Sequence, residues 1–262
     1  MTGVIFVASS CPRRSSKKVM TPFQTLTARL RDANALNDYT RHLEFEVQNS
    51  VRFGFVPGQW ISLKQNKPDG EEITRAYSIA SPPHGNRFAL CLNRVQDGFM
   101  SNHLCDMPEG AELSFQGPFG DFILHPPMRD TIMIATGTGI APFRSMLQWL
   151  FESPQASPPL HENRQVSLVF GVRYQRDLYY DQEFKLLAKE HANFHYLPTL
   201  SRADESWSGA RGYVQDHVKE IVGSRSDMHA YICGLDRMVS ANRDLLKSLG
   251  WDRKSIRYEK YD

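Results

Sequence analysis

The sequence predicts two domains of different class, an antiparallel β-barrel followed by an α/β domain built on a parallel sheet. Up to about Pro126, short segments alternate between apolar and polar residues, with turn signals between them. After Pro126-Pro127, nearly continuous apolar runs alternate with helical patterns. A length of 262 residues accommodates two domains of ordinary size. We therefore expect a tail over residues 1–20, a barrel domain over 21–126 and an α/β domain over 127–262.

In the first half, each expected strand shows apolar residues with a period of two. Within residues 40–47, this period places Leu43, Phe45 and Val47 on one face. Pro-Gly, Asp-Gly and Glu-Gly dipeptides interrupt the pattern. Further strands are expected over residues 59–63, 76–79, 88–92 and 112–115. Short strands at this spacing are typical of an antiparallel barrel.

In the second half, the apolar runs are continuous rather than alternating. Such runs are typical of strands that are buried on both faces. They cover residues 131–135, 166–170, 194–197 and 230–233. Helical patterns between and after them cover residues 142–151, 182–190, 214–222 and 237–249. The alternation predicts a parallel sheet with helices on both faces.

Composition excludes several classes of protein. Hydrophobic residues make up 41% and charged residues 23%, which is typical of a folded globular chain. The net charge of +2 gives no reason to expect nucleic acid or a membrane surface as partner. No apolar stretch approaches the length of about eighteen residues that a spanning helix needs. The four cysteines form no C-x-x-C pair, so we expect no metal or iron–sulfur site.

The first twenty residues differ from the rest. The positive charges of residues 13–18 follow the short apolar run of residues 4–8, whereas in a signal peptide they precede it. We expect a loose tail on a cytoplasmic protein. Translation from Met20 would remove this tail, and lipid attachment at Cys11 is the alternative interpretation.

A glycine-rich turn follows the first apolar run of the second half. Gly137 and Gly139 let a ligand approach the backbone, and Pro142 suits the first turn of a helix. The free N–H groups of that helix would bind a pyrophosphate. The pattern is G-x-G-x-x-P rather than G-x-G-x-x-G, so a purely structural turn is the alternative. Further segments at carboxyl ends of expected strands are residues 171–173, 199–202 and 233–236.

A second group of candidate residues closes a strand of the first half. Arg75 and Tyr77 share a face of that strand, and Ser78 lies on the other. An arginine binds phosphate, an aromatic ring stacks on a flat heterocycle, and a hydroxyl bonds a ring nitrogen. A half-exposed strand of mixed residues is the alternative. Residues 98–104 follow as a turn into a short helix, whose N-terminus also suits a phosphate.

The order of the motifs resembles the ferredoxin–NADP reductase family. The motifs are R-x-Y-S-x-x-S, D-G-x-x-S-x-x-L, G-P-F-G, G-T-G-I-A-P, S-R, C-G and a terminal aromatic strand. The resemblance runs from about Thr21 to the last residue. It implies an FAD-binding barrel followed by a nicotinamide-binding domain, in an FAD-dependent NAD(P)H oxidoreductase.

The resemblance also implies roles for residues around the flavin. Arg75 corresponds to the ligand of the flavin pyrophosphate, Tyr77 to the residue that stacks on the isoalloxazine or on the ribityl side, and Ser78 to the hydroxyl near flavin N5. Tyr261 corresponds to the terminal aromatic that covers the flavin, although here Asp262 follows it. The implied FAD set is Arg75, Ala76, Tyr77, Ser78, Leu92, Asn93, Arg94, Phe99, Met100, Ser101, Thr138 and Tyr261. FMN is the alternative cofactor, because the pyrophosphate ligand is more evident than an adenine pocket.

The catalytic roles implied by the resemblance fall on Ser78, Cys233 and Glu259. They would surround hydride transfer from nicotinamide C4 to flavin N5. Packing at Cys233, backbone bonding at Ser78 and a solvated face at Glu259 are the structural alternatives. The implied nucleotide set is Gly137, Thr138, Gly139, Arg173, Ser201, Arg202, Arg211, Tyr213, Cys233 and Asp236.

The choice between NADPH and NADH depends on one additional phosphate. In NADPH-using members of the family, a Ser-Arg pair and a later basic residue bind the 2′-phosphate, and here Ser201, Arg202 and Arg211 correspond to them. Residues 207–214 also resemble loops of NADH-using oxygenase reductases. We expect NADPH, with NADH as the alternative.

The absence of a cysteine cluster implies that the one-electron acceptor is a separate protein. Ferredoxin and flavodoxin are the expected partners of a monomer, and both are acidic as a rule. A candidate basic rim that could complement them comprises Lys17, Lys18, Arg29, Arg31, Lys64 and Lys67, but we favour the interpretation that these are scattered surface charges. The first alternative is the NADH-dependent reductase component of an oxygenase, with an iron–sulfur partner. The second is a binding module of the same fold without flavin.

Overall fold

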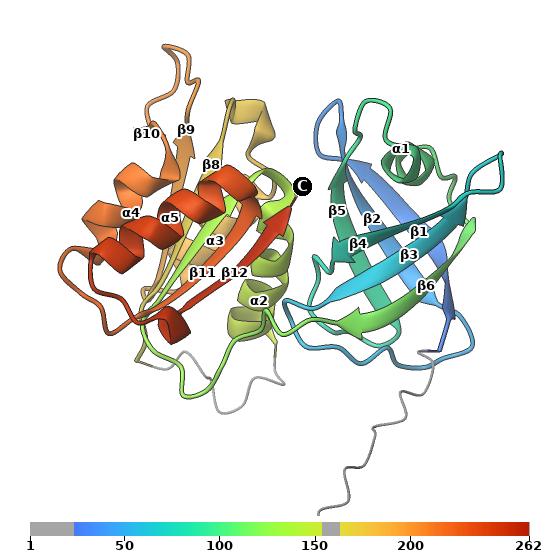
Figure 1. The fold of residues 1–262 in the computed structure, drawn as a ribbon, viewed down its shortest axis with the longest axis horizontal. Helices are drawn as coiled ribbons and strands as arrows, with labels where there is room; N and C mark the ends of the chain where they lie inside the picture. The colour runs from blue at the N-terminus through green and yellow to red at the C-terminus, as the bar shows by residue number, and fades with distance from the viewer. Residues whose placement is uncertain (1–23, 154–162, 262) are drawn as a thin grey trace, which may run out of the picture.

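The computed structural model describes residues 24–153 and 163–261, which form two bodies side by side (Figure 1). The expectations for residues 1–20, including Cys11, Lys17 and Lys18, lie outside the described residues. No helix within the described ranges combines the length and the apolar character needed to cross a membrane.

The first body is a six-stranded antiparallel sheet in the order β4-β3-β6-β1-β2-β5. Its strands are β1 (Leu26–Ala35), β2 (Thr40–Val47), β3 (Trp60–Asn66), β4 (Glu72–Ser78), β5 (Arg87–Asn93) and β6 (Glu112–Phe119). A bridge between Ile79 and Leu90 and a hydrogen bond from Ala80 N to Ala89 O (2.8 Å) join the two ends of the sheet. The sheet is therefore closed into a barrel, and α1 (Phe99–Cys105) follows β5.

The barrel closes around a core of phenylalanines. The rings of Phe45, Phe88 and Phe115 are at most 1% exposed, and Phe53 packs against Phe88 and Phe115 with centroid distances of 5.5 and 5.4 Å. The alternation of residues 40–47 explains this core, because every second side chain of β2 points inward. Each fully buried ring of this kind contributes about 2–3 kcal/mol.

The second body is a six-stranded parallel sheet in the order β10-β9-β8-β7-β11-β12. Its strands are β7 (Thr131–Thr136), β8 (Val166–Val172), β9 (Phe194–Leu200), β10 (Ala210–Arg211), β11 (His229–Leu235) and β12 (Ile256–Tyr261). The helices are α2 (Ala141–Glu152), α3 (Asp181–Glu190), α4 (Val214–Val222) and α5 (Asp236–Ser248). Short 3₁₀ turns are η1 (Gly137–Ile140), η2 (Gln175–Asp177) and η3 (Arg253–Ser255). One apolar cluster packs α2 and α3 on one face, and another packs α4 and α5 on the other.

The predicted fold class is confirmed, and each expected strand and helix is present within a few residues of its predicted bounds. β1 was not among the expected strands. Only Ala28 and Leu30 of β1 are buried, and a bulge between Leu30 and Asp32 breaks the alternation that would have revealed it. The division at residues 126 and 127 stays a prediction.

The two bodies are in direct contact through α2. Arg144 Nη1 donates to Ala80 O (2.8 Å), and Ser145 Oγ donates to Ser81 O (2.6 Å). Arg144 also forms an ion pair with Glu183 of α3 at 2.9 Å. These contacts place the carboxyl ends of β7, β11 and β12 against the barrel, and the end of β12 lies between the two bodies (Figure 1).

Candidate active site

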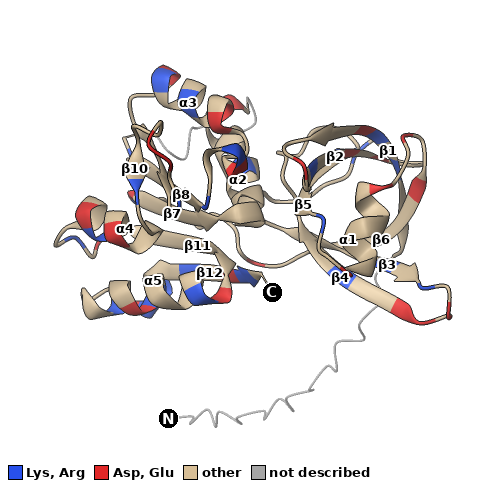
Figure 2. Cartoon of the chain, turned by 90° about the horizontal axis from the view of Figure 1, so that it is seen from above, with Lys and Arg blue, Asp and Glu red and all other residues tan. Residues whose placement is uncertain are grey.

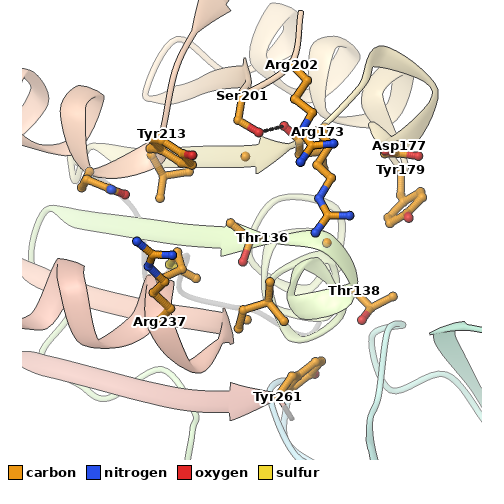
Figure 3. A pocket seen from close by; sticks show the side chains of 18 of the residues that line it. Thr136, Thr138, Arg173, Asp177, Tyr179, Ser201, Arg202, Tyr213, Arg237 and Tyr261 are labelled. Atoms are coloured by element: carbon orange, nitrogen blue, oxygen red, sulfur yellow. Dashed lines mark hydrogen bonds between the residues drawn. The ribbon is translucent and has the colours of Figure 1, made fainter. Parts of the chain in front are cut away.

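Two adjoining cavities lie where the two bodies meet. The cavity on the barrel side has a volume of about 1040 Å³ and is bounded by β4, β5, α1 and the end of β12. The cavity on the side of the parallel sheet has a volume of about 780 Å³ and lies at the carboxyl ends of β7, β8, β9 and β11 (Figure 3). The residues that line both cavities are Asn93, Thr138, Leu235 and Tyr261. We call the two cavities the barrel-side cavity and the sheet-side cavity, and the place where these four residues lie is their junction.

The barrel-side cavity brings together nearly all of the residues expected to bind FAD. Those lining it are Arg75, Ala76, Tyr77, Ser78, Leu92, Asn93, Phe99, Met100, Ser101, Thr138 and Tyr261. Arg94 is not among them, in contrast to the expectation. Its guanidinium turns toward α1, where Nη1 donates to Asn102 Oδ1 and to Asp106 Oδ2, both at 2.9 Å.

Arg75 and Tyr77 lie on the same wall of the barrel-side cavity. The Arg75 side chain is exposed, and its Nη1 donates only to the neighbouring carbonyl of Thr74 among the described residues. Tyr77 is half-buried, and burial raises the pKa of its hydroxyl. An exposed guanidinium next to a half-buried ring can bind phosphate while the ring stacks on a heterocycle.

The turn before α1 is held by its own side chains. Ser101 Oγ accepts from Val95 N and donates to Gly98 O, both at 3.1 Å. A Cβ at Gly98 would lie 2.6 Å from Ser101 Oγ, so this position requires glycine. The Ser101 hydroxyl therefore shapes the turn, and the residues at the start of α1, whose first N–H groups have no partner within the helix, line the cavity.

Ser78, Cys233 and Glu259 come from different parts of the chain and meet beside the junction. Ser78 Oγ donates to Glu259 Oε2 at 3.4 Å, a long hydrogen bond. Glu259 is the register partner of Cys233 on neighbouring parallel strands. Burial raises the pKa of Glu259 to about 7, with a smaller contribution from the charge of Asp121, and the Ser78 contact opposes the shift. Burial also raises the pKa of the Cys233 thiol, which is fully buried.

Tyr261 ends β12 at the junction, as Figure 3 shows. Its ring packs on the core of the parallel sheet, and its buried hydroxyl lies beside the Cys233 thiol and the Ser78 hydroxyl.

The glycine-rich turn forms the floor of the sheet-side cavity. Gly137 has a φ of +54°, and no atom lies within 4 Å of where its Cβ would be. Gly139 is packed so tightly that a Cβ would lie 2.4 Å from Cys233 O. The first glycine therefore supplies the turn, and the second permits the close approach of η1 to β11. Gly139 and Cys233 lie behind the surface of the sheet-side cavity rather than on it.

Three arginines line the sheet-side cavity without a carboxylate partner among the described residues. They are Arg173 after β8, Arg202 after β9 and Arg237 in the first turn of α5 (Figure 3). All three residues are exposed. Among the described residues, the Arg202 guanidinium donates only to the hydroxyl of Tyr174, at 3.3 Å. Since no carboxylate of the described residues neutralises them, these cations are available to an anionic ligand.

Several expected nucleotide ligands line the sheet-side cavity, namely Gly137, Thr138, Arg173, Ser201, Arg202 and Tyr213. Arg211 does not, because its guanidinium donates to the carbonyls of Ala203 (3.2 Å), Asp204 (2.8 Å) and Trp207 (2.7 Å). Asp236 also lies outside, paired with Lys260. Arg237 was missed, although it lies one residue beyond the C-G-L-D segment that was singled out.

The candidate basic rim is largely neutralised within the fold. The described members form ion pairs that join Arg29 to Glu112, Arg31 to Glu46, Lys64 to Glu72 and Lys67 to Glu71. Figure 2 shows positive and negative residues on the same strands of the barrel. These pairs do not support the rim as a docking surface. Within the described ranges, no three His, Cys, Asp or Glu side chains are grouped so as to hold a metal ion.

The donors present fit the two groups that the cavities would hold. The barrel-side cavity combines an exposed guanidinium, a half-buried aromatic ring, the start of α1 and the Ser78 hydroxyl, which suit a flavin with its phosphates. The sheet-side cavity combines a glycine turn with three unpaired guanidinium groups, which suits a phosphorylated dinucleotide. The two cavities join, so two ligands bound in them would be in contact.

Comparisons with known proteins agree with this geometry. A family model described as oxidoreductase FAD-binding domain matches residues 27–123, and one described as oxidoreductase NAD-binding domain matches residues 133–244. Ferredoxin–NADP reductase B of Sorangium cellulosum is 41% identical over 250 residues, which cover 92% of this chain and 98% of the relative. The 2-halobenzoate 1,2-dioxygenase electron transfer component of Burkholderia cepacia is 29% identical over 94% of this chain and 70% of its own length.

A solved structure is also similar. The cytochrome P450 reductase GcoB of Amycolatopsis superimposes with a TM-score of 0.79 at 26% identity, over 93% of this chain and 71% of that one. The similarity extends across both bodies and their junction. This chain belongs to the ferredoxin–NADP reductase family and is an oxidoreductase with an FAD-binding barrel and an NAD-binding α/β domain.

Proposed function

We propose that this protein transfers electrons between NADPH and a separate one-electron carrier such as ferredoxin or flavodoxin. In the overall reaction, one NADPH is oxidised to NADP⁺ with release of a proton, and two carrier molecules each gain one electron. The observation that carries the proposal is the set of three unpaired arginines in a cavity that adjoins the contact between Ser78 and Glu259. The reductase of Sorangium cellulosum, whose name states NADP, supports it.

The number of unpaired cations favours NADPH over NADH. A pyrophosphate carries two negative charges, whereas NADPH adds a third phosphate group on the adenosine ribose. Arg173, Arg202 and Arg237 exceed what a pyrophosphate alone would neutralise. We assign the additional phosphate to Arg202, with Ser201 and Tyr213 beside it and Arg237 in place of Arg211.

We assign roles in the reaction to residues on both sides of the junction. Bound FAD supplies the conversion between two-electron and one-electron transfer. Arg75 and the N–H groups at the start of α1 hold its phosphates, and Tyr77 holds its ring. Ser78 donates a hydrogen bond at the reacting edge, and Glu259, with a pKa of about 7, can hold or release a proton there. Tyr261 shields the junction from water.

The compartment and the oligomeric state belong to the same proposal. We infer a monomer in the cytoplasm, without nucleic acid or membrane as partner. The cysteines Cys91, Cys105 and Cys233 are free thiols, as is usual for proteins of a reducing compartment.

A second candidate function is the NADH-dependent reductase component of an oxygenase system. The similarity to an electron transfer component of a dioxygenase and to a cytochrome P450 reductase favours it. Both of those proteins are longer, and this chain covers 70% and 71% of their lengths. In this case the electron acceptor would be a dedicated iron–sulfur or haem partner.

Anaerobic titration of the purified holoprotein tests the proposal. We expect NADPH to bleach the flavin absorbance, and kcat/KM with NADPH to exceed kcat/KM with NADH by about tenfold or more. Equal or better use of NADH would favour the oxygenase reductase. A flavin that dithionite bleaches but neither nucleotide does would overturn both, and a protein that takes up no FAD would indicate a binding module. Reduction of purified ferredoxin and flavodoxin in parallel identifies the carrier class.

A further inference from the structure

Two consecutive tyrosines connect the α/β domain to the barrel near the junction. Tyr179 and Tyr180 lie between η2 and α3, and Tyr180 has a left-handed backbone with a φ of +60°. A residue in that conformation redirects the chain, so both side chains can face the barrel although neighbours in an extended chain point apart. We call these two residues the tyrosine clasp.

The tyrosine clasp reaches two cross-strand pairs of the barrel that are separated by one intervening pair. Thr40 of β2 is the register partner of Asn93 of β5, and His42 is the partner of Cys91. The Tyr179 hydroxyl lies 2.9 Å from Thr40 Oγ1. The Tyr180 hydroxyl lies 2.9 Å from His42 Nδ1. Each tyrosine therefore contacts one pair.

The hydrogen bonds of Tyr179 form a first branch of the clasp and those of Tyr180 a second, and the two branches lead to different residues. Thr40 Oγ1 donates to Asn93 Oδ1 at 2.7 Å, and Asn93 lines both cavities. His42, the partner of Tyr180, lines neither cavity, and Cys91, which also contacts Tyr180, lines the barrel-side cavity but not the junction. Thr40 is fully buried and Tyr179 is 3% exposed, so water does not compete for the contacts of the first branch.

The oxygen of the Asn93 carboxamide is thus held by the protein, and its NH₂ group is available to a ligand at the junction. Oδ1 is held by Thr40, with the Tyr179 hydroxyl 3.5 Å away. Among the described residues, Asn93 Nδ2 has no hydrogen-bond partner. An amide N–H group needs an acceptor when a ligand displaces water from it. At the junction, the nicotinamide end of the dinucleotide offers one, the carbonyl oxygen of its carboxamide.

We propose that Tyr179 acts through Thr40 as a positioning residue for Asn93, which donates a hydrogen bond to the nicotinamide carboxamide at the junction of the two cavities. This inference rests on the proposed function, because it requires a nicotinamide nucleotide in the sheet-side cavity. In this proposal, the contact between Tyr179 of the α/β domain and Thr40 of the barrel helps to align the nicotinamide with the flavin. A small misalignment of reacting groups costs a large factor in rate.

The test compares Tyr179→Phe with Tyr180→Phe, a matched control that removes the same atom from the neighbouring residue. With the FAD-loaded protein, stopped-flow absorbance gives the rate of flavin reduction at saturating NADPH. Titration of the oxidised protein with NADP⁺ gives its dissociation constant, and thermal denaturation gives Tm. We expect Tyr179→Phe to slow reduction by about fivefold to tenfold and Tyr180→Phe by less than about twofold, with similar Tm values.

A double-mutant cycle shows whether Tyr179 acts through Asn93. We expect Asn93→Ala to slow reduction and weaken NADP⁺ binding, and Tyr179→Phe to add nothing in the Asn93→Ala background. Thr40→Val, which removes only the intervening hydroxyl, should reproduce Tyr179→Phe, and it substitutes for that variant if Tyr179→Phe does not fold.

Two results would overturn the inference. One is an equal loss of rate for Tyr180→Phe and Tyr179→Phe, which would make the clasp a general domain contact. The other is a loss from Tyr179→Phe that persists unchanged in the Asn93→Ala background. A wild-type protein that neither NADPH nor NADH reduces would instead contradict the proposed function, so the two failures are distinguishable.

Discussion

The cationic residues of the barrel surface and those of the sheet-side cavity differ in whether the fold neutralises them. Arg29, Arg31, Lys64 and Lys67 each have a carboxylate partner on the barrel. The cavity arginines, Arg173, Arg202 and Arg237, have none among the described residues. The first group is largely satisfied by the protein itself, whereas the second is available to bind a ligand.

The difference follows from where the residues lie in their elements. Arg29 is the direct register partner of Glu112 on neighbouring antiparallel strands, so the pleat places the two charges together. The cavity arginines follow the ends of parallel strands, where no neighbouring strand supplies a partner. A count of positive residues in a sequence therefore says less about ligands than the position of each in its element.

The largest effect should come from removing two unpaired cations. We expect the double variant Arg202→Ala, Arg237→Ala to lower kcat/KM for NADPH by about 100-fold, because each charge-assisted contact is worth about 1.5–3 kcal/mol. kcat/KM for NADH should fall by less than about threefold. Tm should change little, since neither arginine has a carboxylate partner among the described residues and only the 3.3 Å hydrogen bond from Arg202 to Tyr174 is lost. Equal losses with both nucleotides would show that these arginines do not bind the additional phosphate.

The next effect concerns a cation that is paired and partly buried. Arg144 bonds Glu183 and Ala80 O, and its side chain is only 14% exposed. We expect Arg144→Met to lower the free energy of unfolding by about 2–3 kcal/mol in urea denaturation, because it strands a half-buried carboxylate. Adding Glu183→Gln should recover part of the loss. A variant as stable as wild type would mean that the ion pair at the domain contact contributes nothing.

Glu259, which has no cationic partner among the described residues, should make the stability of the protein depend on pH. The pKa of Glu259 is raised by burial to about 7 from an ordinary value of 4.5, so the folded state holds a proton that the unfolded state releases. Stability therefore falls as pH rises from about 4.5 to about 7 and levels off above that. We expect Glu259→Gln to gain about 2 kcal/mol relative to wild type between pH 5 and pH 8, measured by urea unfolding. A difference independent of pH would contradict the raised pKa.

The smallest effect should come from the exposed pairs of the barrel. Lys64 and Glu72 are 43% and 54% exposed, so their mutual attraction is screened by water. We expect Lys64→Ala to change the free energy of unfolding by less than about 1 kcal/mol and to leave kcat/KM for NADPH unchanged. A marked loss of ferredoxin reduction in this variant, with NADPH use intact, would restore the basic rim as a docking surface.

Much of the fold follows from patterns that are local in the sequence. The alternation of residues 40–47 and the continuous run of residues 131–135 each report how many faces of a strand are buried. The pattern does not predict β1, because a bulge changes the register of this strand partway along. The strand predicted over residues 76–79 begins later than β4, because most residues of β4 are exposed and show little alternation. Elements that bury little leave little periodicity to detect.

The candidate site was predictable where a motif provides backbone geometry and was not where side-chain direction decides. Gly139 packs on Cys233 as a close approach requires, and Ser78 meets Glu259. Arg94 and Arg211 have residue types that suit a phosphate, yet the fold uses both as internal hydrogen-bond donors. A long flexible side chain can reach several partners, and the local sequence does not say which one it meets.

The amino-acid pattern alone predicts the two kinds of sheet, their order, and the turns that require glycine, because periodicity and backbone freedom are local properties. The folded arrangement was needed to show that Asn93 and Tyr179 contact the same buried threonine, that Arg237 lines the sheet-side cavity, and that the two cavities join. These facts depend on how residues distant in the chain are brought together, and the free energy of that packing is shared by the whole fold rather than stored in any one segment.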